Sequence, residues 1–298
     1  MKHLLSLESL PATDMAEILA LTQTLKATRG HHTEHPLRHQ CWGLIFSKSS
    51  TRTRVSFEVG IRELGGDVLF LSTNDIQLGR GEPIKDTARV MGRMLHGAVI
   101  RTFAQSDVED FARYSNIPTI NALTDDEHPC QILADLFTIQ EKLGTYEGKT
   151  ITFIGDGACN VPASWIWAAS KLNFNLRIAA PKAFQPAPEL IARAGGNLVV
   201  TDDIRAAAEG ADVLYTDVWV SMGMEKETEY RLAQLGGYQI NSDLLKLAAP
   251  GALAMHCLPA YRGKEITDEV MESQAETIFA EAENRLHVQK AVLTWLSK

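Results

Sequence analysis

The stretch CWGLIFSKSSTRTRVSFEVGIRELGG, residues 41–66, decides the fold. It opens with six residues that are apolar apart from one glycine, a pattern typical of a buried strand. Small hydroxylated residues follow, and then apolar residues at helical spacing that end at Gly65 and Gly66. Hydroxylated residues commonly begin helices, and glycines commonly end them. The stretch therefore predicts a strand, a loop and a helix, which is the repeating unit of parallel sheets covered by helices.

Arg52 and Arg54 lie at or beside the start of that predicted helix. The positive end of the helix dipole is there, and it disfavours cations. A bound phosphate would remove the conflict, because hydroxyls, free backbone N–H groups and arginines together bind anions. The alternative is that Ser50 or Thr51 only caps the helix and the arginines reach elsewhere. Arg101, at the end of another predicted strand, favours the anion site.

The alternation of strands and helices continues outward from this stretch. A long helical pattern at 128–144 interrupts it, and then the alternation begins again. We therefore expect an α/β protein of two domains, each a parallel sheet flanked by helices, joined by long interdomain helices, with the active site in the cleft. The expected bounds are 1–126 for a first domain completed by a C-terminal helix at 280–298, 127–145 for the interdomain helix, and 146–279 for a second domain.

Composition narrows the class of partner. The 298 residues carry a net charge of -8 with no basic block, which argues against nucleic acid and anionic membrane surfaces. The four cysteines are scattered without a CxxC pair, so we expect a reducing, cytoplasmic setting and no metal module. No apolar run approaches the roughly 20 residues of a membrane span, and the N-terminus does not resemble a signal peptide.

Polar and reactive side chains follow the predicted strands in both halves. In open α/β sheets, ligands bind at the carboxyl ends of the strands. Residues placed at such ends or just after them are Ser50, Thr51, Arg52, Thr53, Arg101, His128, Asn160, Asp217, Ser221 and Cys257. We therefore expect these side chains to line a ligand-binding cleft.

Four motifs carry a resemblance to a known family. They read STRTR at 50–54, HPCQ at 128–131, DVWVSMG at 217–223 and HCLP at 256–259. Together and in this order they resemble the aspartate/ornithine carbamoyltransferase family, and the last two resemble its ornithine branch. The likeness runs from about Leu4 to the C-terminus. Two departures from common usage are Cys130 within HPCQ and Met224 after SMG, and neither removes a functional group.

The resemblance implies transfer of the carbamoyl group of carbamoyl phosphate to the δ-amine of L-ornithine, without cofactor or metal. The first domain would be the carbamoyl phosphate-binding domain and the second the ornithine-binding domain. Arg101 would bridge the phosphate and the carbonyl oxygen, His128 would polarise that carbonyl, and Gln131 would hold the carbamoyl NH2. The full implied donor set is Ser50, Thr51, Arg52, Thr53, Gln77, Arg101, His128, Gln131, Cys257, Leu258 and Arg285.

The implied acceptor site must bind an amino acid with a cationic side chain. Asp217 and Ser221 suit its α-amino group, while Asn160 and the backbone of Met222 suit its carboxylate. The attacking amine must be neutral, yet an alkyl amine has a pKa of about 10.4. In the family, Cys257 beside Asp217, with the carbonyl of Leu258, receives and orients the amine proton. Arg101, His128, Asp217 and Cys257 are thus the expected catalytic residues.

The polar segment at 75–90 predicts an assembly only through the resemblance. In relatives, this loop reaches the neighbouring subunit's site, where the position of Gln77 contacts carbamoyl phosphate. A homotrimer, or a multiple of trimers, with shared active sites is therefore implied. The alternative is a plain surface loop.

Several rival interpretations remain at this stage. GDGACN at 155–160 suggests a dinucleotide site, but the third glycine and the following acidic residue are missing. The histidines between 31 and 39 suggest a metal site, although a solvated loop away from the cleft is the simpler prediction. Putrescine or an N-acylated ornithine is an alternative acceptor, and a non-catalytic member is another alternative. The same groups serve arginine biosynthesis and the reverse, catabolic direction.

Overall fold

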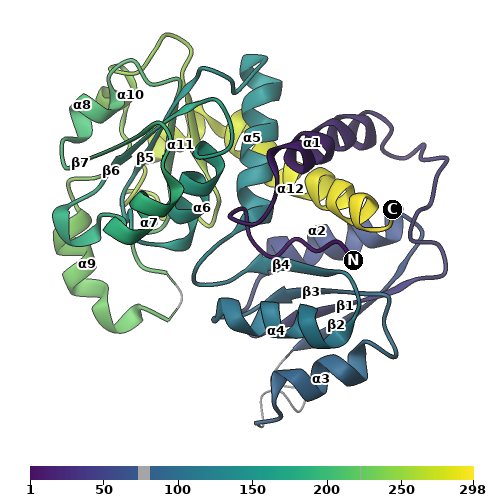
Figure 1. Cartoon of the computed structure of the whole chain (residues 1–298). Coiled ribbons are helices and arrows are strands. Elements are labelled where there is room, and N and C mark those ends of the chain that lie inside the picture. Colours follow the sequence, from purple (N-terminus) through teal and green to yellow (C-terminus); the bar gives the residue numbers. More distant parts are fainter. Residues whose placement is uncertain (73–80, 222) are drawn as a thin grey trace. The chain divides into compact units, whose positions relative to one another are not determined.

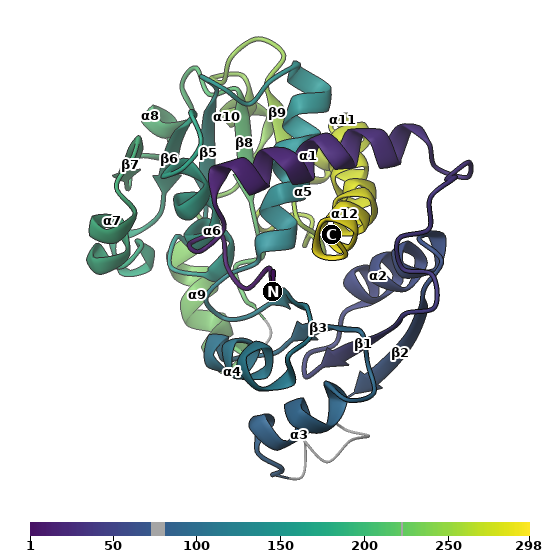
Figure 2. The same cartoon turned by 45° about the vertical axis from the view of Figure 1, so that its right-hand side comes forward.

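The computed structural model describes residues 1–72, 81–221 and 223–298. The chain divides into two compact units, Met1–Phe137 with Asn284–Lys298, and Thr138–Glu283. Each unit contains one parallel sheet with helices packed on it, and two views show their elements (Figures 1 and 2). The predicted α/β class with two parallel sheets is confirmed.

The sheet of the first unit has the strand order β2-β1-β3-β4, and neighbouring strands run parallel. Its strands are β1 (Cys41–Phe46), β2 (Asp67–Ser72), β3 (Gly97–Arg101) and β4 (Thr119–Leu123). Its helices are α1 (Ala12–Ala27), α2 (Thr51–Glu63), α3 (Ile84–Met91) and α4 (Gln105–Ser115).

Local sequence explains the close pairing of β1 with β3. Trp42 lies opposite Gly97 in the register, and a Cβ on Gly97 would come within 2.5 Å of the Trp42 ring. Only glycine fits there, because real Cβ atoms do not approach that closely. A core cluster of Ile45, Ala98, Ile100, Phe111 and neighbouring apolar residues then packs α4 on the sheet.

The sheet of the second unit has the order β7-β6-β5-β8-β9, again parallel throughout. Its strands are β5 (Thr150–Ile154), β6 (Asn175–Ala179), β7 (Leu198–Thr201), β8 (Val213–Thr216) and β9 (Leu253–His256). Its helices are α6 (Asn160–Ala169), α7 (Pro188–Ala194), α8 (Ile204–Ala208), α9 (Thr228–Leu235), α10 (Ser242–Leu245) and α11 (Asp268–Ser273), with 3-10 turns η2 (Lys182–Phe184) and η3 (Glu225–Glu227). The buried Trp165 packs edge-on against Phe174 and Tyr215, so it belongs to the core of this unit.

Two helices contain the boundaries between the units. Helix α5 (Pro129–Leu143) begins in the first unit and ends in the second. Helix α12 (Ala275–Leu296) begins in the second unit, and its residues from Asn284 onward belong to the first. No helix in the described part of the chain combines the length and apolar character that crossing a bilayer requires.

Strand order locates the ligand-binding edge of each sheet. In the first sheet, the order in which the chain adds strands reverses between the parallel neighbours β1 and β3, and in the second between β5 and β8. Such switch points open a crevice at the carboxyl ends of the two strands, because the following loops turn away from each other. The segment after β1 leads to Ser50, and β3 ends at Arg101. The segment after β5 leads to Asn160, and β8 is followed by Asp217.

Candidate functional site

Helix α2 begins at Thr51, four residues before the apolar periodicity that predicted it. Ser50 is its N-cap, with extended backbone and a side-chain oxygen that accepts from the Thr53 N–H at 3.3 Å. Arg54 turns away, because its Nε donates to Glu58 at 2.7 Å and its guanidinium lies 3.7 Å from the Phe70 ring centroid. Ser50 therefore caps the helix and Arg54 reaches elsewhere, and a role of the Ser50 hydroxyl toward a phosphate stays a prediction.

Arg52 behaves differently from Arg54. It is exposed at the same helix start, and its side chain makes no polar contact within the described residues. No acidic residue occupies the first turn of α2. An unpaired cation beside free backbone N–H groups is a suitable partner for an anion.

Three buried side chains join the start of α2 to two other helices. The Arg285 guanidinium of α12 donates to Gln131 Oε1 at 2.5 Å and to Thr53 Oγ1 at 3.2 Å. Arg285, Gln131 and Thr53 are 4%, 1% and 2% exposed. One guanidinium thus contacts two side chains that lie 154 and 232 residues away from it in the sequence. The predicted donor residues Thr53, Gln131 and Arg285 do come together.

Arg101 and His128 lie in the same charged environment. Both are buried, Arg101 at the end of β3 and His128 immediately before α5. Burial lowers the pKa of His128 well below its usual value, and the charges of Arg285 and Arg101 lower it further. His128 is therefore a neutral imidazole at physiological pH, able to donate one hydrogen bond without carrying charge.

A lysine that the sequence did not single out supports the segment before His128. Lys48 Nζ, on a side chain 6% exposed, pairs with Asp125. The same ammonium lies 4.2 Å from the Phe103 ring centroid. Lys48 is in the loop after β1 and Asp125 follows β4, so this pair ties two strand-end loops together.

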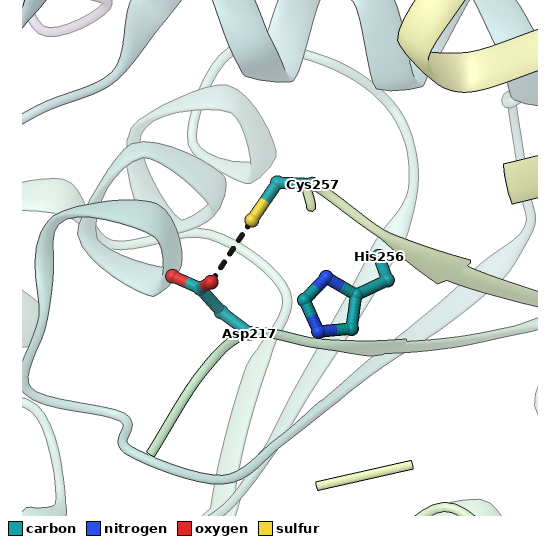
Figure 3. Close-up of side chains that lie close together, drawn as sticks. All are labelled: Asp217, His256 and Cys257. Carbon is teal, nitrogen blue, oxygen red and sulfur yellow. Dashed lines mark hydrogen bonds between the residues drawn. The ribbon is translucent and has the colours of Figure 1, made fainter. Parts of the chain in front are cut away.

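The second unit places a thiol against a carboxylate (Figure 3). Cys257 Sγ donates to Asp217 Oδ1 at 3.0 Å, and the Val218 N–H donates to the same oxygen at 2.7 Å. Burial raises the pKa of Asp217, while His256 and these two hydrogen bonds act in the opposite direction. Asp217 follows β8 and Cys257 follows β9, which are neighbouring strands.

The remaining acceptor predictions have different outcomes. Asn160 is the first residue of α6, and Ser221 lies in the segment after β8. Met222 and Gln77 lie outside the described residues.

The turn that resembled a dinucleotide motif contains Asp156. Its carboxylate accepts from Arg231 at 2.6 Å and from the Ala158 N–H at 3.0 Å. A carboxylate directed into this turn disfavours a pyrophosphate there.

His256 supports the backbone that follows Cys257. Its Nδ1 accepts from the Leu258 N–H at 2.9 Å, so the proton is on Nε2, which bonds to Glu265 Oε1 at 3.1 Å. Leu258 has φ 56, a left-handed conformation that leucine rarely adopts. His256 and Glu265 are both fully buried, and Glu265 also accepts from the Tyr261 N–H at 2.6 Å.

Glu281 of α12 provides a second anchor for this segment. Its carboxylate accepts from the His256 N–H at 3.0 Å and from the Tyr215 hydroxyl at 3.3 Å. Sequence analysis missed both Glu265 and Glu281. Their local sequences, RGKEITDEV at 262–270 and FAEAENRL at 279–286, gave no signal, because other charged residues lie nearby and the burial of both acids appears only in the folded chain.

Metal binding is a poor explanation for these groups. Ligand atoms of Asp217, His256 and Cys257 lie within 4.8 Å of one another. Both imidazole nitrogens of His256 already have partners, however, and the thiol donates a hydrogen bond to the carboxylate.

The histidines at 31–39 were expected in a solvated loop. This prediction is wrong for His32, whose side chain is 6% exposed and whose Nε2 lies 3.1 Å from Lys290 Nζ.

Comparison with known proteins covers both units. Residues 2–141 match a family described as aspartate/ornithine carbamoyltransferase, carbamoyl-P binding domain, and residues 147–296 match its Asp/Orn binding domain. The chain is 57% identical over 300 residues to an ornithine carbamoyltransferase of Akkermansia muciniphila, covering 100% of this chain and 98% of that one.

Solved structures agree with this similarity. The anabolic ornithine carbamoyltransferase of Campylobacter jejuni gives a TM-score of 0.93 at 41% identity, covering 99% of each chain. The ornithine carbamoyltransferase of Pyrococcus furiosus gives 0.92 at 43% identity, covering 98% of this chain and 96% of that one.

Proposed function

Because the chain belongs to the aspartate/ornithine carbamoyltransferase family over nearly its whole length, we propose that its two sets of residues bind the two substrates of one reaction. The chain transfers the carbamoyl group of carbamoyl phosphate to the δ-amine of L-ornithine, and the products are citrulline and phosphate. The amine nitrogen bonds to the carbonyl carbon, and the bond from that carbon to the phosphate oxygen breaks. The proton lost by the amine leaves with the phosphate.

The network of Arg285, Gln131 and Thr53 carries the donor half of the proposal. The start of α2 offers the Ser50, Thr51 and Thr53 hydroxyls, free N–H groups and the exposed Arg52 to the phosphate. Arg285 adds a buried cation at the same helix start. Helix N–H groups with arginines are the usual protein partners of a phosphate dianion. Gln77 remains in the proposed donor set as an untested prediction.

In this proposal, Arg101 and His128 act on the carbonyl. Negative charge develops on the carbonyl oxygen when the amine attacks, and donors placed at that oxygen lower the barrier. Arg101 supplies a fixed cation shared with the phosphate. His128 supplies a neutral N–H donor, because burial and the two arginines hold it unprotonated. Cys257 and Leu258 complete the proposed set of residues that bind carbamoyl phosphate.

Asp217 and Cys257 carry the acceptor half. The Asp217 carboxylate, with Ser221, suits a cationic α-amino group, and Asn160 with Met222 suits the α-carboxylate. The thiol of Cys257, held by Asp217 at 3.0 Å, is a polar group that can orient the attacking amine and pass its proton. A free α-amino group explains a carboxylate at this position, which favours ornithine over N-acylated acceptors.

Finer features of the function are also proposals. We infer the biosynthetic direction, toward arginine, from the anabolic description of the Campylobacter jejuni relative. A homotrimer with shared sites is supported by exposed apolar side chains on the first unit, with Val55, Leu69 and Met94 at 54%, 50% and 69%. All four cysteines are free, which suits a reducing cytoplasm.

The test is citrulline formation by the purified protein. Ornithine, putrescine and N-acetylornithine are compared as acceptors at a fixed concentration of carbamoyl phosphate. We expect a kcat/KM for ornithine at least about 100-fold above the others. N-acetylornithine lacks the cationic α-amino group that suits Asp217, and putrescine lacks the α-carboxylate that suits Asn160. Equal turnover of putrescine would overturn the acceptor assignment, and absence of citrulline would overturn the proposed reaction.

A further inference from the structure

We propose that Asp135 is a positioning residue that fixes the amide of Gln131, so that the donor site selects a carbamoyl group over an acyl group of similar size. Gln131 Nε2 donates to Asp135 Oδ1 at 2.8 Å. The two residues are one turn apart on α5, and Asp135 is fully buried. The inference rests on the proposed function, because it concerns the ligand of the same donor site.

The orientation of the Gln131 amide follows from the chemistry of its two partners. Arginine has only donors and a carboxylate has only acceptors. The Arg285 guanidinium at 2.5 Å must therefore face the amide oxygen, and Asp135 must face the amide nitrogen. A reversed amide would place N–H groups against Arg285 and oxygen against carboxylate oxygen, so Asp135 and Arg285 together exclude it.

This orientation presents an acceptor to the donor site. A carbonyl-type oxygen has two lone pairs, of which Arg285 uses one. The other suits the NH2 of a carbamoyl group, which has hydrogens to donate. The methyl of an acetyl group has nearly the same size and no such hydrogen. A site built around a buried hydrogen-bond acceptor rejects the analogue that lacks the donor, because the acceptor is then left unpaired.

Asp135 contributes to that selection without touching the ligand. With Asp135 replaced by leucine, the buried Nε2 loses its acceptor, and the amide rotates to find another partner. The oxygen is then no longer held toward the ligand. Removing one partner of a buried hydrogen bond costs about 1–3 kcal/mol, which corresponds to about 5- to 150-fold in the preference for the carbamoyl group.

The experiment uses two stable phosphonates and needs no turnover. Phosphonoacetamide carries the NH2 of the donor, and acetonylphosphonate carries a methyl in its place. Dissociation constants of both are measured by calorimetry for the wild-type protein, D135L, D135N and I132V. Ile132 is a fully buried neighbour on α5 with no polar group, so I132V controls for packing in that helix.

We expect the wild-type protein and I132V to prefer phosphonoacetamide by the same factor. D135L should reduce that preference by about 10-fold or more through weaker phosphonoacetamide binding. D135N should restore most of it, because its side-chain oxygen still accepts from Gln131. Equal weakening of both phosphonates in D135L, or an unchanged preference, would overturn the proposal.

A double-variant comparison covers the case in which D135L does not fold. Q131M removes the amide, and Q131M/D135L removes both polar groups, so no amide is left unpaired. If Asp135 acts through Gln131, the two proteins show the same preference between the phosphonates. A further change on adding D135L to Q131M would refute the inference. Failure of the proposed function is separate, since it would appear as absence of citrulline from the wild-type protein.

Discussion

Arg285 and Thr53 are 232 residues apart in the chain, yet the guanidinium of Arg285 donates to Thr53 Oγ1 at 3.2 Å. Thr53 lies in the first turn of α2 and Arg285 in α12. The start of α2, which we propose binds phosphate, is therefore joined by a residue 232 positions beyond Thr53 in the chain. A sequence motif of five residues, STRTR, thus describes only part of the site it belongs to.

Replacing Arg285 tests this relationship through donor affinity. We expect R285Q to raise the KM for carbamoyl phosphate by about 10- to 100-fold, because it removes charge-assisted hydrogen bonds from a buried position. The KM for ornithine should change little. K298Q is the matched control, since Lys298 also bonds from the C-terminal segment but pairs with Glu17 at the surface. Steady-state kinetics with each substrate varied in turn decides the matter; an unchanged donor KM would contradict the assignment.

The thiol of Cys257 provides a test on the acceptor side. C257S keeps a polar group beside Asp217, whereas C257A leaves that carboxylate with one fewer donor. We expect kcat/KM for ornithine to fall by about 10-fold or more in C257A and by less in C257S, as for loss of one hydrogen bond to a charged group. Binding of phosphonoacetamide should stay within about threefold of wild type. Loss of phosphonoacetamide binding with unchanged acceptor kinetics would show that the thiol contributes to the donor site alone.

Burial of His128 predicts a dependence of stability on pH. Its pKa in the folded chain is well below the usual 6.5, so the unfolded chain binds this proton first as the pH falls. Stability is therefore unaffected above the unfolded value and declines as the pH drops below it. H128N removes this contribution, and its unfolding curves should depend less on pH between about 5 and 6.5 than those of wild type. His3 and His32 also have lowered pKa values, so H32N serves as a comparison. Parallel curves for H128N and wild type would contradict the assigned burial effect.

Glu265 supports the left-handed Leu258 through His256, and its removal should affect both stability and acceptor use. Removing one partner of a buried hydrogen bond costs about 1–3 kcal/mol, and the Glu265 carboxylate accepts two such bonds. We expect E265L to lose stability of that order and to lower kcat with ornithine, while E265Q, whose oxygen still accepts, loses less. E272L is a suitable control, because Glu272 pairs with Arg262 at the surface. Denaturant unfolding and kinetics are measured together; normal kcat in a folded E265L would exclude the supporting role.

Local patterns in the sequence predicted the strands better than the helix ends. The apolar run CWGLIF coincides with β1 (Cys41–Phe46), since polar residues flank it at both ends. Helix α2 begins earlier than its apolar periodicity, because the Ser50 cap, not the apolar face, sets the first turn. The short helices α9 and α11 were missed, as their few apolar positions depend on what packs against them.

The candidate site residues show the same difference between what local sequence indicates and what only the folded chain reveals. Motifs identified Thr53, His128 and Cys257, because each lies directly after a strand or at a helix start. Asp135 and Glu265 could not be identified that way. Their importance comes from a buried partner, and burial depends on the folded chain and not on neighbouring residues. Asp135 lies in a largely apolar stretch, QILADLF, which is a signal for a buried acid, whereas the charged neighbours of Glu265 conceal its burial.

The first unit is discontinuous in the chain, since its segment Asn284–Lys298 follows the whole of the second unit. That segment contributes fully buried apolar residues such as Val288 and Val292, besides Arg285. During translation, the N-terminal part of the first unit therefore emerges from the ribosome first but lacks part of its core until Asn284–Lys298 has been translated. The second unit, which is continuous from Thr138 to Glu283, is fully translated before that segment of the first unit. A nascent chain thus finishes its downstream unit before its upstream one, and premature termination within α12 leaves the donor-binding half without its closing helix.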